Sequence, residues 1–290
     1  MKKALAFLLL AALLATPLTG CDKAEGGDEP DKTTTESKDN GDNIPEYNAA
    51  DANPASDFEY EVGEDGGITI TRYIGTDTTV VIPEKIEGKN VTAIGEGAFH
   101  RCDTITSVSL PDTLTCIGRV AFAYCTSLKH IRIPAHSFDN VPMDDALSTF
   151  VNSGLESVEL AEGIKFIPNA AFANTKLKEV VLPNSIQKIN RSAFEDCTSL
   201  HKVTLNEGLT SIGVSAFGNT GLTEIVIPKS VKSLWHSAFE GATALQKVYF
   251  EGNAPEWFMT EEKAPFTVYY HEGATGFTTP KWNGYTTEIW

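Results

Sequence analysis

The sequence predicts a repeat solenoid of the α/β type, mostly β, with a parallel sheet along one face and short or 3-10 turns along the other. Two observations predict this fold: a recurring phenylalanine and a strand-like pattern that follows it. The phenylalanines are 22 or 23 residues apart, with one longer interval of 28 residues. A fixed period of this length indicates similar coils that stack on one another. The recurring residues are Phe99, Phe122, Phe150, Phe172, Phe194, Phe217 and Phe239.

A short apolar pattern after each phenylalanine predicts one strand per coil. It begins five or six residues later and reads apolar-x-x-apolar-x-apolar, as in ITSVSL at 105–110 and LKEVVL at 177–182. Alternate side chains of a strand face opposite ways. We therefore expect Val108, Leu110, Ile131, Ile133 and their equivalents to point inward. One coil cannot bury its own apolar face, so each phenylalanine should pack on the next.

These repeats resemble a known family. The stretches VTAIGEGAFHRCDTITSVSLP and LTCIGRVAFAYCTSLKHIRIP are similar to the BspA-like leucine-rich repeats of bacterial surface proteins and lipoproteins. With the opening ITITRYIGTDTTVVIPEKIEGKNVTAIG and the close VYFEGNAPEWF, the resemblance covers about four-fifths of the chain. It implies a leucine-rich-repeat solenoid with capping units at both ends. It also implies protein binding, because members of the family include adhesins for matrix proteins such as fibronectin.

The first 21 residues, MKKALAFLLLAALLATPLTGC, predict a lipoprotein signal peptide at 1–20. Two lysines precede an apolar run that is too short to span a bilayer and that ends in small residues. Leu18 to Cys21 resemble the bacterial lipobox, which implies cleavage before Cys21 and lipidation of its thiol. Two or three acyl chains anchor a protein stably. We expect a lipid-anchored, extracytoplasmic, surface-exposed protein at the cell membrane or outer membrane.

Residues 21–57 are predicted to be a lipidated cysteine followed by an acidic, disordered linker. Between Asp22 and Asp57 there are eleven acidic residues and three lysines. The net charge of this segment, −8, is half of the chain's net charge of −16. Such a segment cannot bury enough apolar surface to order itself, and its charges extend it. The acidic balance also argues against nucleic acid as a partner.

The repeats, with an N-terminal cap, are assigned to residues 58–250, and a C-terminal cap to 251–290. Phe58–Arg72 is predicted to form a hairpin that turns at GEDGG. The C-terminal cap is rich in aromatic residues, which supply a core from few side chains. Each cap shields a terminal coil from water.

Three cysteines lie three residues after a recurring phenylalanine: Cys102, Cys125 and Cys197. The resemblance implies Asn or Cys at such a turn, where a short group satisfies loop backbone, and in the shorter repeats Asn152, Asn174 and Asn219 stand nearby. We expect small buried thiols. A disulfide between Cys102 and Cys125, which belong to adjacent coils, is an alternative. Cys116 lies outside the pattern and is a candidate for an exposed thiol.

The outward positions of the strands form two columns, in which neighbours lie roughly 4.8 Å apart. The first column runs Thr79, Ser107, His130, Ser157, Glu179, Lys202, Glu224, Lys247, and its last four charges alternate. The second runs Val81, Ser109, Arg132, Glu159, Val181, Thr204, Val226, Tyr249. The alternation favours cross-strand pairs, and a recognition stripe is the alternative. The candidate partner-binding residues are His130, Arg132, Glu159, Glu179, Lys202, Thr204, Glu224, Lys247 and Tyr249.

No catalytic or cofactor-binding motif is found: the sequence has no P-loop, HExxH, GxSxG or Rossmann fingerprint. Asp139, Asp144 and Asp145 lie in an insertion at Ala135–Thr149, but their spacing fits no EF-hand loop, so no metal is expected. The functional hypothesis is non-catalytic binding or adhesion to a protein of a host, of the matrix or of a neighbouring cell surface. The alternatives are a passive envelope protein and a glycan-binding module that uses Trp257, Trp282 or Tyr249.

Overall fold

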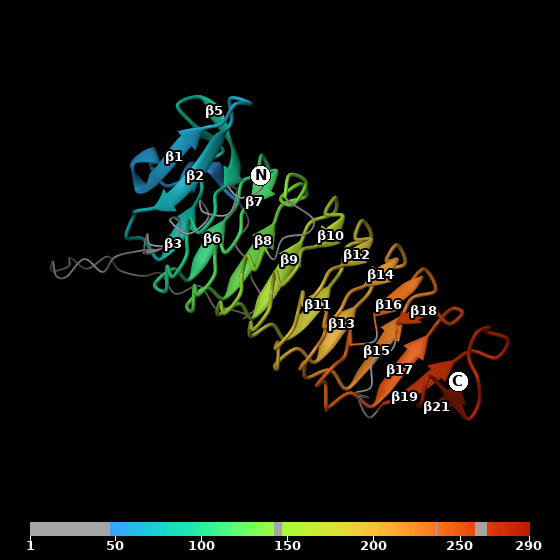
Figure 1. Ribbon diagram of the computed structural model, residues 1–290. Coiled ribbons are helices and arrows are strands. Elements are labelled where there is room, and N and C mark those ends of the chain that lie inside the picture. Colours follow the sequence, from blue (N-terminus) through green and yellow to red (C-terminus); the bar gives the residue numbers. More distant parts are fainter. Residues whose placement is uncertain (1–46, 142–146, 236, 259–265) are drawn as a thin grey trace, which may run out of the picture.

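The protein is one elongated solenoid of stacked coils (Figure 1). The computed structural model describes residues 47–141, 147–235, 237–258 and 266–290, with backbone alone at 257 and 258. Each coil contributes one strand to a long parallel array, the main sheet, which is hydrogen-bonded in three successive segments, and the chain then turns back through a phenylalanine-containing segment. The strands of the main sheet are β3 (Thr79–Val81), β6 (Ser107–Ser109), β8 (His130–Ile133), β9 (Ser157–Leu160), β11 (Glu179–Val181), β13 (Lys202–Thr204), β15 (Glu224–Ile227), β17 (Lys247–Phe250), β19 (Thr267–Tyr270) and β21 (Tyr285–Ile289).

A second, narrow ladder of parallel strands runs along the solenoid and was not predicted. Its members are two or three residues long and lie just before each phenylalanine turn. They are β7 (Cys116–Ile117), β10 (Phe166–Ile167), β12 (Lys188–Ile189), β14 (Ser211–Ile212), β16 (Ser233–Trp235) and β18 (Glu256–Phe258). The ladder is continuous from β10 to β18. Before β10 the insertion interrupts it, and there the Ile117 amide donates to the carbonyl of Ser137 instead (2.8 Å).

The coils share one dry core, as the sequence predicted. The seven phenylalanine rings form a continuous stack, with ring centroids 4.8–6.0 Å apart. All seven are at most 2% exposed. The inward strand residues Val108, Leu110, Ile131 and Ile133 are also buried. Stacking therefore buries what a single coil would leave in water.

The far side of each coil is a hydrogen-bonded turn rather than a 3-10 helix. The phenylalanine amide of one coil donates to a carbonyl of the next, as from Phe172 to Ala193 (2.9 Å). Two residues after the phenylalanine the backbone is left-handed, and Asn152, Asn174 and Asn219 occupy that position with φ near +55°. Asparagine tolerates this conformation better than most residues. The asparagine therefore lies one residue before the cysteine position and does not replace the cysteine.

At the cysteine position itself, Thr175 and Thr220 replace the thiol in shorter coils. Their hydroxyls donate to the carbonyls of Phe172 and Phe217, whereas Cys125 and Cys197 donate to the phenylalanine carbonyl of the preceding coil. Cys102, Cys125 and Cys197 are fully buried. Cys125 carries a free thiol, so no Cys102–Cys125 disulfide forms.

Burial should also make the thiols of Cys125 and Cys197 unreactive. It raises the pKa of Cys125 to about 12 and that of Cys197 to about 11, and only the thiolate is a nucleophile. We expect iodoacetamide at pH 8 to leave both unmodified in the native protein and to alkylate both after unfolding in urea. Cys116, which is half-buried, should react before them. Peptide mass spectrometry measures the order, and rapid native alkylation of Cys125 would contradict the buried position.

Hairpins close both ends of the solenoid. At the N-terminal end β1 (Phe58–Val62) pairs antiparallel with β2 (Ile68–Tyr73). On its other side β2 pairs parallel with β5 (Lys89–Ile94), and β5 pairs antiparallel with β4 (Lys85–Ile86). At the C-terminal end β20 (Lys281–Trp282) pairs antiparallel with β21. Inside the C-terminal cap, Phe250, Phe277 and Trp282 pack ring against ring.

The free edge of β3 is covered by a segment that the sequence assigned to the linker. Residues 48–57 contain two 3-10 helices, η1 (Ala49–Asp51) and η2 (Ala55–Asp57). Between them, the Asn53 amide donates to the Val81 carbonyl (2.9 Å), and the Val81 amide donates to Asn53 Oδ1 (2.8 Å). The folded part thus begins before Phe58, because the open backbone of an edge strand offers partners to a segment that lacks apolar side chains.

Candidate interaction face of the main sheet

The outward columns are aligned as predicted. Residues of the first column pair in register from Thr79 to Ser157, from Glu179 to Lys202, and from Glu224 to Lys247. Two members of the second column are not available to a partner, because Val81 and Ser109 are buried. Val81 is the residue that pairs with Asn53. All nine candidate partner-binding residues lie on this outer face, and each is half-buried or exposed.

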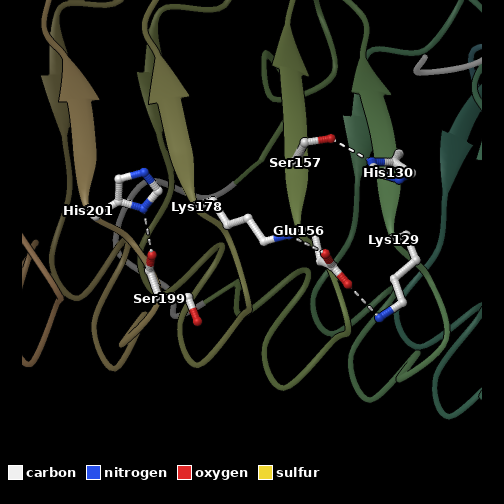
Figure 2. Close-up of polar contacts among 7 residues, drawn as sticks. All are labelled: Lys129, His130, Glu156, Ser157, Lys178, Ser199 and His201. Carbon is white, nitrogen blue, oxygen red and sulfur yellow. Dashed lines mark hydrogen bonds and ion pairs between the residues drawn. The ribbon is translucent and has the colours of Figure 1, made fainter. Parts of the chain in front are cut away.

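The N-terminal half of the face is occupied by pairs within the chain (Figure 2). Glu156 lies between two lysines of neighbouring coils, 2.8 Å from Lys129 Nζ and 2.7 Å from Lys178 Nζ. One position along, His130 Nδ1 lies 2.6 Å from the Ser157 hydroxyl. These contacts stabilise adjacent coils against each other and leave their polar groups already satisfied.

The second column repeats this arrangement. Arg132 lies 3.0 Å from Asp112 and 3.3 Å from Glu159. In the next part of the first column, Glu179 pairs with Lys202 at 3.1 Å. Of the four alternating charges in the first column, Glu179 and Lys202 form the expected cross-strand pair, whereas Glu224 and Lys247 lie in register without an ion pair between them.

The ion pairs of Glu156 make the stability of the fold depend on pH. Hydrogen bonds from Lys129 and Lys178 lower the pKa of its carboxyl from 4.5 to about 2. A carboxyl whose folded pKa is depressed stabilises the fold above its unfolded pKa, and that stabilisation is lost as pH falls through the folded pKa. We expect Glu156→Gln to lower the free energy of unfolding by about 0.3–1 kcal/mol at pH 7, as for part-exposed pairs. In urea titrations the difference should disappear between pH 4.5 and 2, and a difference that persists at pH 2 would contradict this origin.

In the C-terminal half of the face, the second column carries exposed apolar and aromatic side chains, interrupted by Thr204, beside the charged residues of the first column. Val181 is 63% exposed, Val226 42% and Trp290 47%. Tyr249 stacks on Tyr269 with ring centroids 4.8 Å apart, and Trp290 lies 4.7 Å from Tyr249. Trp290 also stacks on His271 at 4.7 Å. We call Tyr249, Tyr269, His271 and Trp290 the aromatic cluster.

Sequence reasoning missed three of these four residues. Tyr269 and His271 belong to TVYYH, which pairs in register with KVYF of β17 and so repeats the strand pattern. That pattern could have been recognised, although no recurring phenylalanine turn precedes it. Trp290 follows β21 and contacts residues of both β17 and β19, which no local pattern indicates.

Other candidate residues are placed differently. Trp282 is only 6% exposed and packs inside the C-terminal cap, so it cannot present a face to a sugar ring. In the insertion, Asp139 lies 2.7 Å from His136. Cys21, Asp144, Asp145 and the side chain of Trp257 lie outside the described residues.

Two observations hold for the described residues, 47–141, 147–235, 237–258 and 266–290. In these ranges no group of three or more His, Cys, Asp or Glu side chains is arranged to hold a metal ion. Over the same ranges, no helix is both long and apolar enough to cross a bilayer.

This architecture defines a leucine-rich-repeat solenoid, and the comparisons with known proteins agree. The model of the BspA type leucine rich repeat region matches in six copies over residues 78–144 and 146–246. The chain belongs to this family. Repeats of this kind typically serve as protein-binding scaffolds without catalytic activity, and the match identifies no catalytic family.

Solved structures of bacterial leucine-rich-repeat proteins are similar. A leucine rich cell surface protein from Faecalibacterium prausnitzii is 29% identical over 69% of this chain, with a TM-score of 0.52. This chain covers 54% of that protein, or about half of its length. The leucine rich repeat protein of T. pallidum is 26% identical, with 75% of this chain and 86% of that one covered and a TM-score of 0.34. No curated protein matches.

Proposed function

We propose that this protein is a non-catalytic binding protein of the bacterial surface, and that it docks a protein partner on the outer face of the main sheet. The observation that carries the proposal is the group of exposed large apolar side chains on the C-terminal half of that face, Val181, Val226 and Trp290. Exposed apolar side chains grouped on one face of a rigid scaffold and bordered by polar residues are typical of a protein interaction site. The resemblance to a cell surface protein supports the same setting.

The proposal includes a membrane anchor and a tether. Residues 1–20 are the leader, Cys21 carries the lipid, and the acidic segment after it holds the domain away from the membrane. Cys21→Ala should move the protein from the membrane fraction to the medium or periplasm, measured by fractionation and immunoblotting. Continued membrane association of this variant would contradict lipid anchoring.

The binding test uses the purified protein on an array of extracellular-matrix and bacterial surface proteins. We expect a protein ligand whose binding is lost when Val181→Lys and Val226→Lys are combined, because two charges would then have to be desolvated in the interface. The matched control is Lys188→Glu, an exposed charge change on the second ladder. If no protein binds, or if the valine variants bind as well as the wild type, the docking proposal fails and a passive envelope role remains.

The glycan alternative loses one of its three residues, since Trp282 is buried. Tyr249 remains on the surface, and it stacks on Tyr269 next to Trp290. A sugar is therefore one of the occupants that the experiments on the aromatic cluster must separate from a protein.

A further inference from the structure

The aromatic cluster differs from the N-terminal half of the main sheet in its contacts. In the N-terminal half, charged side chains of adjacent coils pair with one another, as Glu156 does with Lys129 and Lys178. At the C-terminal end, the Trp290 ring contacts Tyr249 and His271, its backbone amide donates to the Tyr270 carbonyl, and the residue is 47% exposed. Rigid aromatic side chains of this kind are the anchors on which partner binding concentrates.

Three glutamates lie on or beside the strands that carry the cluster. Glu288 pairs in register with Tyr269, so the two residues lie side by side on neighbouring strands. Glu251 follows Tyr249 on the same strand side, and Glu224 faces Lys247 on the neighbouring strand. Within the described part of the chain, none of these three carboxylates forms an ion pair, unlike the acidic residues of the N-terminal half.

The ligand chemistry that fits these groups is cationic. The face of an aromatic ring attracts a guanidinium or an ammonium, and tryptophan attracts it most strongly. A cationic side chain already lies beside the cluster, because Lys247 stands two residues before Tyr249 on β17. The net charge of −16 would raise the local concentration of cations and repel anions.

We propose that the aromatic cluster binds arginine or lysine side chains of a basic protein segment. This inference rests on the proposed protein-binding function and specifies the chemistry of its partner. The cationic groups lie against Trp290 and Tyr249 and pair with Glu288. Apolar side chains of the same segment lie along Val226 and Val181, which continue the face toward the N-terminal half.

The test measures binding of the full protein to a fluorescein-labelled decapeptide of alternating arginine and glycine, by fluorescence anisotropy at low and physiological salt. A peptide with citrulline in place of arginine keeps the shape and removes the charge. We expect the arginine peptide to bind and the citrulline peptide to bind at least tenfold more weakly. Trp290→Ala and Glu288→Gln should each weaken arginine-peptide binding about two- to fivefold, as for an exposed cation–π or ion contact.

Two matched controls distinguish peptide binding at the cluster from nonspecific attraction of a cationic peptide to an acidic protein. Glu240→Gln removes the same charge from an exposed position on the turn side, and Tyr124→Ala removes an aromatic ring, 40% exposed, from that side as well. Both should bind the peptide as the wild type does. Circular dichroism melts should show that Trp290→Ala still folds, since this side chain lies on the surface.

Four outcomes would overturn the inference. The first is equal binding of the citrulline peptide, and the second is arginine-peptide binding that none of the cluster variants weakens. The third is Trp290-dependent binding of a neutral oligosaccharide, such as maltohexaose, in place of the peptide. A protein ligand that depends on Val181 and Val226 but is indifferent to Trp290 and to salt would also exclude a cationic partner, while the proposed docking face would stand.

Discussion

Phe172→Ala is expected to lower the free energy of unfolding by about 3–5 kcal/mol. The ring is fully buried, with Phe150 at 5.3 Å on one side and Phe194 at 5.5 Å on the other. Its removal leaves a cavity in the middle of the stack, and neither neighbour can close it without breaking the register of its own coil. Because each coil contacts mainly the coils beside it, the defect separates the solenoid into two halves.

Urea unfolding followed by circular dichroism measures this effect. Val181→Ala is the control, since Val181 is 63% exposed on the outer face, and its substitution should change stability by less than about 0.5 kcal/mol. A loss of less than about 1 kcal/mol for Phe172→Ala would show that the ring stack does not hold the coils together.

Asn53→Ala should have the second largest effect, a loss of about 2–3 kcal/mol. The side chain is 8% exposed and makes three hydrogen bonds, to the Val81 amide and to the carboxylates of Asp57 and Asp77. Alanine leaves the buried amide of Val81 without its partner, which costs about 1–3 kcal/mol, and loosens the segment around it.

The same substitution should promote self-association, because it uncovers the edge of β3 for pairing with another chain. Size-exclusion chromatography with light scattering measures this at increasing protein concentration. Asn48→Ala is a suitable control, since its side chain caps the exposed helix η1 and does not contact the edge. A monomeric Asn53→Ala protein with wild-type stability would contradict the edge-covering role.

The coil period, the strands of the main sheet and the ring stack were all predictable. They depend on burial, and burial leaves a periodic apolar pattern that a single sequence displays. The cross-strand pairs around Glu179 and Lys202 were predictable for the same reason, because a parallel register places equivalent residues side by side.

What the sequence did not indicate depends on contacts outside that period. The strands of the second ladder are too short to show alternation, and the linker composition concealed the role of Asn53, which comes from hydrogen bonds and not from apolar burial. Among the tryptophans, composition could not distinguish the buried Trp282 from the exposed Trp290. That difference decides which aromatic residues are available to a ligand.

The arrangement of the strands has a mechanical consequence. The hydrogen bonds between coils, such as that from Phe172 to Ala193, run along the long axis of the solenoid, so tension between its two ends pulls them directly. Coils should then detach one after another from an end, each releasing a length of about 70 Å for 22 residues. Evenly spaced steps of that length in single-molecule extension would reveal a molecule that lengthens gradually under load, whereas one abrupt rupture of the whole array would contradict it.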